Sequence, residues 1–209
     1  MAYSYVWYQT QTPQEITDII CNDIIKFDDQ LKSSKVIDYD INTIEDKKIR
    51  NSRNAWIPSS HWIPGFVWHY IALANRMNFL YDIECIDGET LQYTEYREGC
   101  FYDWHADSSI KDSYMPKQIR GMDRNIHEDM QIIKGESIRK LSFTMQLSDP
   151  EEYDGGEFQL MDQGRNMFYG PKEKGSIIIF DSRLSHRIRK VKSGVRKSLV
   201  GWVVGPRWK

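Results

Sequence analysis

The sequence predicts a mainly β protein: an antiparallel double sheet of jelly-roll type, with N-terminal α-helices packed on one sheet. Two observations support this fold class. The first 89 residues hold two patterns with helical character, whereas residues 90–209 hold many short strand patterns separated by turns rich in Gly, Asp and Pro. A chain of 209 residues fits one core, so we expect a single domain with a helical support region, 1–89, and a jelly-roll core, 90–209.

The first predicted helix begins at a capping-box pattern. Thr12-Pro13-Gln14-Glu15 places a side-chain cap at Thr12, proline at the first helical position and an acid three residues after the cap. Apolar residues then recur at helical spacing over about five turns. These residues are Ile16, Ile19, Ile20, Ile24, Phe27 and Leu31. A short strand is expected at 54–57, and Pro64 opens a second helix that continues through Phe79.

The predicted strands of the core are short and bounded by turn residues. They cover Leu91–Tyr96, Tyr102–Ala106, Arg139–Leu147, Gly156–Met161, Ser176–Phe180, His186–Val191 and Val195–Val204. A polar insertion, Ser108–Ser137, interrupts the series for roughly thirty residues, a length typical of a functional lid or a disordered insertion. Because it begins directly after Asp107, the lid is favoured.

Composition and charge argue against several functional classes. A net charge of −2 and a pI near 6.2 provide no global field for a polyanion, so a nucleic-acid partner is not expected. Cys21, Cys85 and Cys100 are widely spaced, which argues against a disulfide framework or a zinc site and favours a reducing cytoplasm. The first eight residues lack a signal-peptide pattern, and no apolar stretch can span a bilayer, so no membrane association is expected.

A His-x-Asp triplet lies on the second predicted strand of the core. Residues two apart on a strand share one face, so His105 and Asp107 can bind the same ion. Two imidazoles and one carboxylate on one face of an octahedral ferrous ion leave three positions open, as oxygen activation with a chelating cosubstrate requires. The triplet alone is a weak signal, because hydrogen-bonded His–Asp pairs are common on protein surfaces. A third ligand has to come from elsewhere in the chain.

His186 is the candidate for that third ligand. His61 and His69 lie at or in the second predicted helix, and His127 lies in the long insertion. His186 instead lies on a strand in the second half of the sheet, after a buried strand and a turn. The predicted metal ligands, and thus the catalytic centre, are His105, Asp107 and His186.

A hairpin is predicted directly after His186. If Lys192-Ser193-Gly194 forms a tight loop that pairs Val191 with Val195, then Lys190 faces Arg196 across the hairpin. The residues that then share one sheet face are His186, Arg196, Ser198 and Trp202.

Arg196 is the predicted anchor for a dicarboxylate. In the hairpin register it lies four strand residues along from His186, or about 13 Å at roughly 3.3 Å per residue. 2-Oxoglutarate can bridge that gap, because one end chelates iron while its far carboxylate forms a bidentate pair with the guanidinium. Ser198, two residues on, can donate a further hydrogen bond to the same carboxylate.

Further motifs surround these residues. They are Tyr96-Arg97-Glu98-Gly99, Tyr102-x-x-His105-x-Asp107, Leu147-Ser148-Asp149-Pro150, Tyr153-x-Gly155-Gly156-Glu157-Phe158 and Phe180-Asp181-Ser182. Together they resemble the iron(II) and 2-oxoglutarate dependent dioxygenases, and within them the prolyl 4-hydroxylase-like group that includes bacterial and viral prolyl and lysyl hydroxylases. The resemblance covers most of the chain, although the insertion matches no pattern of that group.

The resemblance implies a double-stranded β-helix fold and an enzyme that hydroxylates an unactivated C–H bond. Its cosubstrates would be O2 and 2-oxoglutarate, its products succinate and CO2, and its reductant ascorbate. By the same resemblance Tyr96 would contact 2-oxoglutarate, Arg196 would stand at the basic position of the group, and Tyr102 would line the site beside the iron. We expect Tyr102 and Trp202 in the substrate pocket, and a peptidyl proline in a protein or peptide as the substrate.

Three alternatives stay open. The first keeps the chemistry but acts on a nucleic acid, which the near-neutral charge disfavours, or on a free amino acid. The second is a non-catalytic jelly-roll binding module, although a vestigial site commonly loses one ligand or the basic anchor and here all are present. The third, a zinc or manganese enzyme of the cupin type, lacks the additional clustered histidines. Fold kinship leaves the hydroxylated position and the oligomeric state undetermined.

Overall fold

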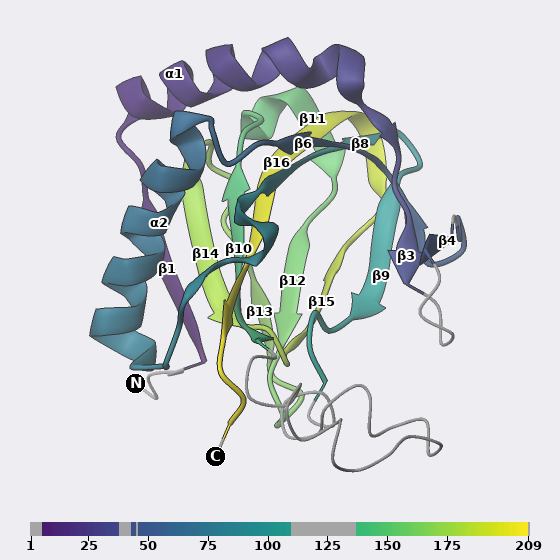
Figure 1. The fold of residues 1–209 in the computed structure, drawn as a ribbon. Coiled ribbons are helices and arrows are strands. Elements are labelled where there is room, and N and C mark those ends of the chain that lie inside the picture. The colour runs from purple at the N-terminus through teal and green to yellow at the C-terminus, as the bar shows by residue number, and fades with distance from the viewer. Residues whose placement is uncertain (1–5, 38–42, 45, 110–136, 209) are drawn as a thin grey trace.

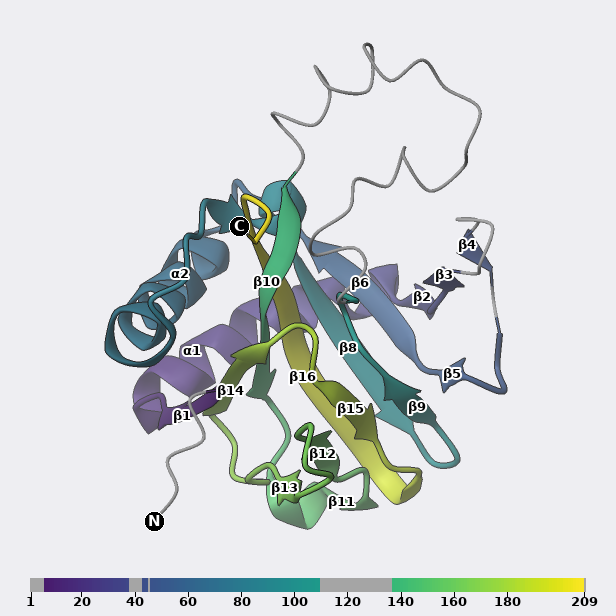
Figure 2. The same ribbon diagram turned by 90° about the horizontal axis from the view of Figure 1, so that it is seen from below.

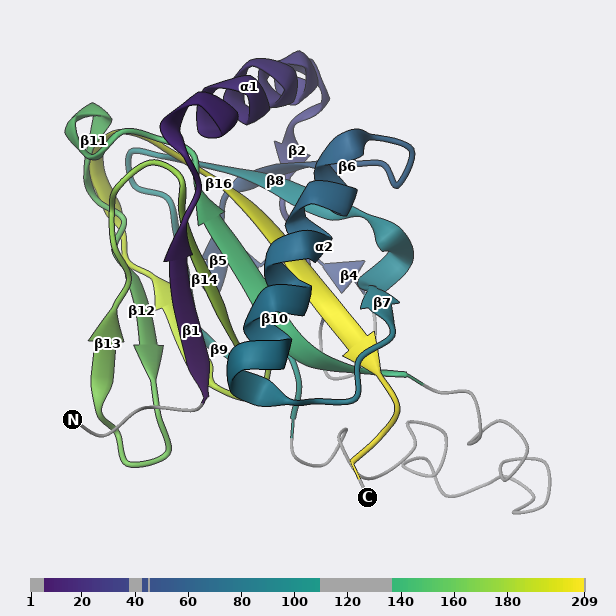
Figure 3. The ribbon, with the colours of Figure 1, turned by 90° about the vertical axis from the view of Figure 1, so that its left-hand side faces the viewer.

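The computed structural model describes residues 6–37, 43–44, 46–109 and 137–208. Two antiparallel β-sheets face each other, and two helices cover the outer face of the larger sheet (Figure 1; Figure 2). Figure 3 shows α2 in front of the long strands β10 and β16, with α1 above them. The mainly β class and the packing of helices on one sheet are therefore confirmed.

The large sheet contains the long strands of the chain. Its order is β1 (Trp7–Gln11), β14 (Ser176–Asp181), β10 (Ile138–Gln146), β16 (Val191–Gly205), β8 (Leu91–Arg97), β6 (Arg53–Ile57) and β2 (Lys32–Ser33), with β7 (Cys85–Ile86) and β11 (Tyr153–Gly155) also paired to β16. The region 1–89, expected to be helical support, thus supplies strands to this sheet as well, because the aromatic segment at Trp7 and the segment at Asn54 find partners only in the folded chain.

The small sheet closes the other side of the interior. Its order is β13 (Met167–Tyr169), β12 (Phe158–Met161), β15 (Ser185–Ile188), β9 (Phe101–His105) and β5 (Arg50–Asn51). Strands β3 (Val36–Ile37) and β4 (Thr43–Ile44) form a separate pair. The predicted lid at Ser108–Ser137 lies almost wholly outside the described residues.

Both helices lie where the apolar spacing predicts them. The first, α1 (Gln14–Ile24), continues as a 3-10 helix through Gln30, and the second, α2 (Trp62–Ala74), continues as a π-helical turn through Phe79. No helix among the described residues is long and apolar enough to cross a membrane.

The predicted capping box of the first helix is wrong. Pro13 is itself the cap residue, and no side chain bonds the free backbone N–H groups there. Thr12 is buried, and its hydroxyl contacts the hydroxyl of Thr17 and donates to the carbonyl of Gly175. The end of β1 lies beside the turn before β14, so the Thr12 side chain bonds to that turn and is unavailable as a helix cap.

Apolar and polar side chains alternate along β10, and this alternation creates an interior site. Leu141, Phe143 and Met145 point outward and pack in the apolar cluster that also contains the buried residues of both helices. Ser142 and Thr144 point to the opposite face, toward the small sheet, and line a cavity. The large sheet therefore buries an apolar face under the helices and turns a polar face to the interior.

The predicted hairpin after His186 is also wrong. Residues 192–194 belong to the continuous strand β16, in which Val191 pairs with β11 and Val195 pairs with β8. His186 lies in the small sheet and Arg196 in the large one, so Lys190 does not face Arg196 in a hairpin. A tight loop would have kept both strands in one sheet, whereas here the chain crosses between the sheets at Arg189 and Lys190. The metal candidate and the basic residue face each other across the interior.

Candidate active site

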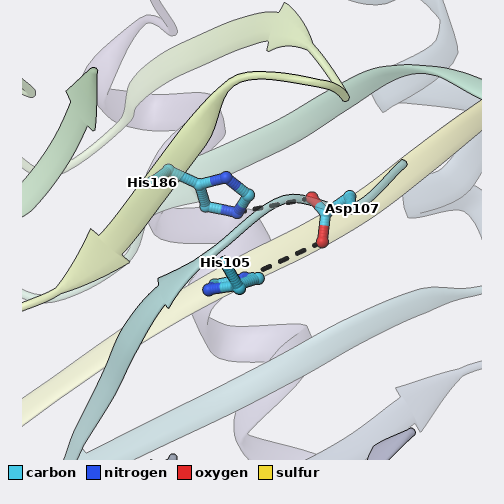
Figure 4. Close-up of side chains that lie close together, drawn as sticks. All are labelled: His105, Asp107 and His186. Atoms are coloured by element: carbon cyan, nitrogen blue, oxygen red, sulfur yellow. Dashed lines mark ion pairs between the residues drawn. The ribbon is translucent and has the colours of Figure 1, made fainter. Parts of the chain in front are cut away.

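Three side chains meet between the sheets at the end of β9 (Figure 4). His105 is the last residue of β9, Asp107 follows two residues later, and His186 lies on β15 directly opposite His105. Nε2 of His186 is 3.4 Å from Oδ2 of Asp107, and Nε2 of His105 is 3.8 Å from Oδ1. One ligand atom from each residue can be chosen so that all lie within 4.8 Å of one another. The sequence-predicted triad is therefore brought together.

Backbone carbonyls orient both imidazoles. Nδ1 of His105 lies 2.8 Å from the carbonyl of Asp103, and Nδ1 of His186 lies 3.0 Å from the carbonyl of Leu184. A carbonyl only accepts, so Nδ1 carries the proton in each ring and Nε2 presents its lone pair toward Asp107. This is the tautomer in which Nε2 can bind a metal.

The position of the Asp107 carboxylate is set by Ser142 on β10 and by Ser182 in the turn after β14. The hydroxyl of Ser142 donates to Oδ2 over 2.6 Å and lies 3.0 Å from the hydroxyl of Ser182. The carbonyl of Ser182 accepts from the backbone N–H groups of Asp107 and Ser108. The amide of Ser182 donates in turn to the carbonyl of Lys140 on β10. The position of Asp107 therefore depends on β10 and on the turn after β14.

The protonation states suit a cation. Burial, and then the neighbouring His186, lower the pKa of His105 to about 3, so its ring is neutral at physiological pH. Burial alone would raise the pKa of Asp107, but the nearby imidazoles and the hydrogen bond from Ser142 outweigh it and lower that pKa. A buried carboxylate beside the neutral ring of His105 leaves negative charge for a divalent cation to neutralise.

The triad opens into a narrow cavity of about 40 Å³ in water-accessible volume. The ring of Tyr102 stacks on His105 at 3.5 Å between centroids, and the guanidinium of Arg50 lies over Tyr102 at 4.6 Å. Trp202 closes another wall, and its Nε1 is buried without a hydrogen-bond partner among the described residues. A buried indole N–H without an acceptor is costly in the free protein, and a ligand oxygen would satisfy it.

Arg196 is buried deeper in the interior. It is 3% exposed and makes no ion pair with an acidic side chain in the part of the chain that the structure describes. Its Nη1 donates to the hydroxyl of Ser198 over 3.3 Å, and the guanidinium lies 5.5 Å from the ring centroid of Tyr96, its cross-strand neighbour on β8. Burial lowers the pKa of Arg196, yet a guanidinium keeps its charge at neutral pH. An unpaired buried cation calls for an anion from outside the chain.

These residues fit an octahedral ferrous ion with a chelating acid. Two imidazoles and one carboxylate provide the donor set of non-haem iron(II) oxygenases and leave adjacent positions for other ligands. Ser198 and Tyr96 line the same cavity as the triad, so the space beside the metal candidates extends toward Arg196.

Sequence reasoning missed several residues of the site. Ser142, Arg50 and Gln92 line the cavity, and Ser142 contacts the carboxylate directly. The available signal was the polar alternation of Ser142 and Thr144 within an otherwise apolar strand. Polar residues at alternate positions of a strand normally indicate a solvent-facing side of the sheet. Here the small sheet covers that side of β10, so it becomes an interior face.

Comparison with known proteins agrees with this geometry. The chain is 33% identical over 89 residues to a PKHD-type hydroxylase of Parvibaculum lavamentivorans, a match that covers 43% of this chain and 40% of that protein. The first curated relatives are matched over 40–47% of their own length, so the chain spans less than half of each.

Solved structures share the fold at low identity. A Pseudomonas putida prolyl-4-hydroxylase has a TM-score of 0.67 and 16% identity, covering 98% of this chain and 95% of that one. A Trichoplax adhaerens prolyl hydroxylase, solved with a hypoxia inducible factor peptide fragment, has a TM-score of 0.71 and 13% identity, covering 97% and 84%. Identities this low establish the fold alone.

The family itself is recognised from the sequence of the core. The family described as the 2OG-Fe(II) oxygenase superfamily matches residues 91–204, a stretch that contains the triad, Arg196 and every strand of the interior except β1, β2, β5, β6 and β7. More than half of the chain is covered by this match, and this chain therefore belongs to the 2OG-Fe(II) oxygenase superfamily.

Proposed function

We propose that this protein is an Fe(II)- and 2-oxoglutarate-dependent oxygenase that hydroxylates an unactivated C–H bond. The observation that carries the proposal is the convergence of His105, Asp107 and His186, with ligand atoms within 4.8 Å, in a cavity that extends toward a buried arginine without an acidic partner among the described residues. A binding module without catalysis would have no use for two imidazoles, a buried carboxylate and a separate buried cation in one interior.

The three residues hold the metal, and the chain positions the cosubstrate. Bound Fe(II), with 2-oxoglutarate and O2, supplies the oxidising power, and the cosubstrate leaves as succinate and CO2. Arg196 pairs with the carboxylate of 2-oxoglutarate far from the metal, and Ser198 and Tyr96 line the path between. Tyr102 and Trp202 form the walls beside the metal and keep bulk water away. Ascorbate would serve as the reductant.

The substrate that we propose is a proline in a protein or peptide. The support comes from similarity alone: the relatives are called PKHD-type hydroxylases, and the solved structures include prolyl hydroxylases, one with a bound peptide fragment. A panel of proline-containing peptides, analysed by mass spectrometry for a gain of one oxygen, tests this part. Hydroxylation of free amino acids or of single-stranded nucleic acid, with no peptide modified, would contradict it.

We propose that residues 1–209 act as one catalytic unit, with 1–89 as support and 90–209 as the core. Strands from both regions lie in both sheets, which supports a single unit. A reducing cytoplasm is the proposed location, since the cysteines are widely spaced along the chain.

Anaerobic titration with Fe(II) and 2-oxoglutarate tests the cofactor site without a known substrate. Chelation of ferrous iron by a 2-oxo acid produces a weak visible charge-transfer band, which we expect in the wild type and not in His186→Ala. The control is Ser176→Ala, a buried serine on β14 whose hydroxyl donates to Gln11, away from the triad. No band in the wild type, or an equal band in His186→Ala, would refute the proposed metal ligands.

A further inference from the structure

The cation at the inner end of the site has neutral neighbours. The guanidinium of Arg196 contacts the hydroxyl of Ser198, the ring of Tyr96 and the hydroxyl of Tyr153. Each of these groups is uncharged, so none compensates the positive charge that folding has removed from water. Ser198 and Tyr96 are on the neighbouring positions of the sheet, whereas Tyr153 comes from β11, at the edge of the large sheet.

Tyr153 is held with its hydroxyl in the interior. Its side chain is buried, and its hydroxyl accepts a hydrogen bond from Nε2 of Gln146 over 2.8 Å. Gln146 is also buried and lies on the inner face of β10, where it is the cross-strand partner of Ser198. The side-chain amide of Gln146 therefore directs an N–H group at the phenolic oxygen, and the guanidinium of Arg196 lies beside it.

This arrangement leaves one donor without an acceptor. A phenolic oxygen that accepts from the amide N–H of Gln146 keeps its own proton for donation. No described residue accepts that proton in a hydrogen bond. Burial raises the pKa of Tyr153, so the hydroxyl stays protonated at neutral pH despite the nearby guanidinium. A spare O–H donor beside an unpaired guanidinium is a donor set suited to a carboxylate.

A glycine permits this approach. At Gly156, which has a φ of +62°, a Cβ would lie 3.1 Å from Cδ of Arg196, 3.4 Å from Cε2 of Tyr153 and 3.0 Å from Cγ2 of Val191. Any larger residue would thus crowd the side chains of Val191 and Arg196 and contact the ring of Tyr153. The glycine keeps these two side chains close together at the inner end of the site.

We propose that Tyr153 is a further cosubstrate-binding residue, whose hydroxyl donates to the far carboxylate of 2-oxoglutarate beside Arg196, and that Gln146 positions it. This inference rests on the proposed function, since it concerns the same cosubstrate. The proposal adds a residue from β11 to the site. It predicts that preference for an acid with a second carboxylate depends on the neutral hydroxyl of Tyr153 as well as on the guanidinium of Arg196.

The test compares two 2-oxo acids that differ only in the far carboxylate. Calorimetric titration of 2-oxoglutarate and of 2-oxopentanoate into the Mn(II)-loaded protein measures binding without turnover. Tyr153→Phe removes the hydroxyl and keeps the ring. A hydrogen bond to a charged group is worth about 1.5–3 kcal/mol, so we expect roughly 10- to 100-fold weaker binding of 2-oxoglutarate and unchanged binding of 2-oxopentanoate.

Two comparison variants separate the possible failures. Tyr93→Phe removes another buried hydroxyl, bound to Asp28 on the outer face of the large sheet, and is expected to bind both acids like the wild type. Arg196→Met is expected to bind 2-oxoglutarate much more weakly than the wild type. The role of Tyr153 is refuted, and the proposed function stands, if Arg196→Met weakens 2-oxoglutarate binding while Tyr153→Phe binds 2-oxoglutarate with wild-type affinity. The same holds if Tyr153→Phe binds both acids more weakly by the same factor. Normal 2-oxoglutarate binding by Arg196→Met would overturn both.

Discussion

Replacing Ser142 with alanine tests how the fold holds the metal carboxylate. The hydroxyl of Ser142 donates to Oδ2 of Asp107 over 2.6 Å in a buried site. A hydrogen bond to a charged acceptor contributes about 1.5–3 kcal/mol. Loss of a hydrogen-bond partner that orients a metal ligand typically lowers metal affinity by about 10- to 100-fold. The hydrogen-bond energy and this fold-change agree, because about 1.4 kcal/mol corresponds to a factor of ten in affinity. We expect Ser142→Ala to weaken Mn(II) binding by that factor.

Titration of the metal-free protein with Mn(II), followed by electron paramagnetic resonance of the free ion, measures the affinity directly. Ser176→Ala is the matched control, because it removes another buried hydroxyl, which donates to Oε1 of Gln11 over 2.7 Å. This hydrogen bond joins the first residue of β14 to the last residue of β1, away from the triad. His186→Ala sets the scale for the loss of a ligand. Wild-type affinity in Ser142→Ala, together with a large loss in His186→Ala, would refute the reasoning that Ser142 orients the carboxylate.

Three further outcomes are expected from the structure. Gly156→Ala introduces a Cβ within 3.1 Å of the Arg196 stem at a φ of +62°, so calorimetry should show weaker 2-oxoglutarate binding with unchanged Mn(II) binding; loss of both would point to misfolding instead. Phe143→Ala empties a fully buried position between sheet and helices, and urea unfolding should show a loss of about 3–5 kcal/mol, whereas a loss below about 1 kcal/mol would contradict the packing. Burial lowers the pKa of Lys140, whose ammonium lies 3.6 Å from the ring centroid of Trp208. Between that lowered pKa and 10.5 the unfolded chain binds more protons, so wild-type stability should rise with pH through this window and Lys140→Met should flatten the rise; parallel curves would contradict it.

Local patterns in the sequence were sufficient for most of the elements. The strand at Arg139–Leu147 is observed as Ile138–Gln146, and the helical spacing after Pro13 is observed as α1 and its 3-10 extension. Both predictions depend on residues close together in the chain, so periodicity captures them. The capping box failed for the opposite reason, since the hydroxyl of Thr12 is bound to Gly175, far away in sequence.

The sequence by itself determined the fold class, the two helices and the His105-x-Asp107 pair, because each follows from the spacing of residues close together in the chain. Only the tertiary structure decided that His186 lies opposite His105 on the neighbouring strand of the small sheet, and that Arg196 lies in the other sheet. It also decided that Ser142 and Tyr153 belong to the site. The physical reason is that a carboxylate, an imidazole and a guanidinium are brought together by pairing between strands that are distant in the chain. The register of that pairing follows from burial of whole sheet faces, which no short segment encodes.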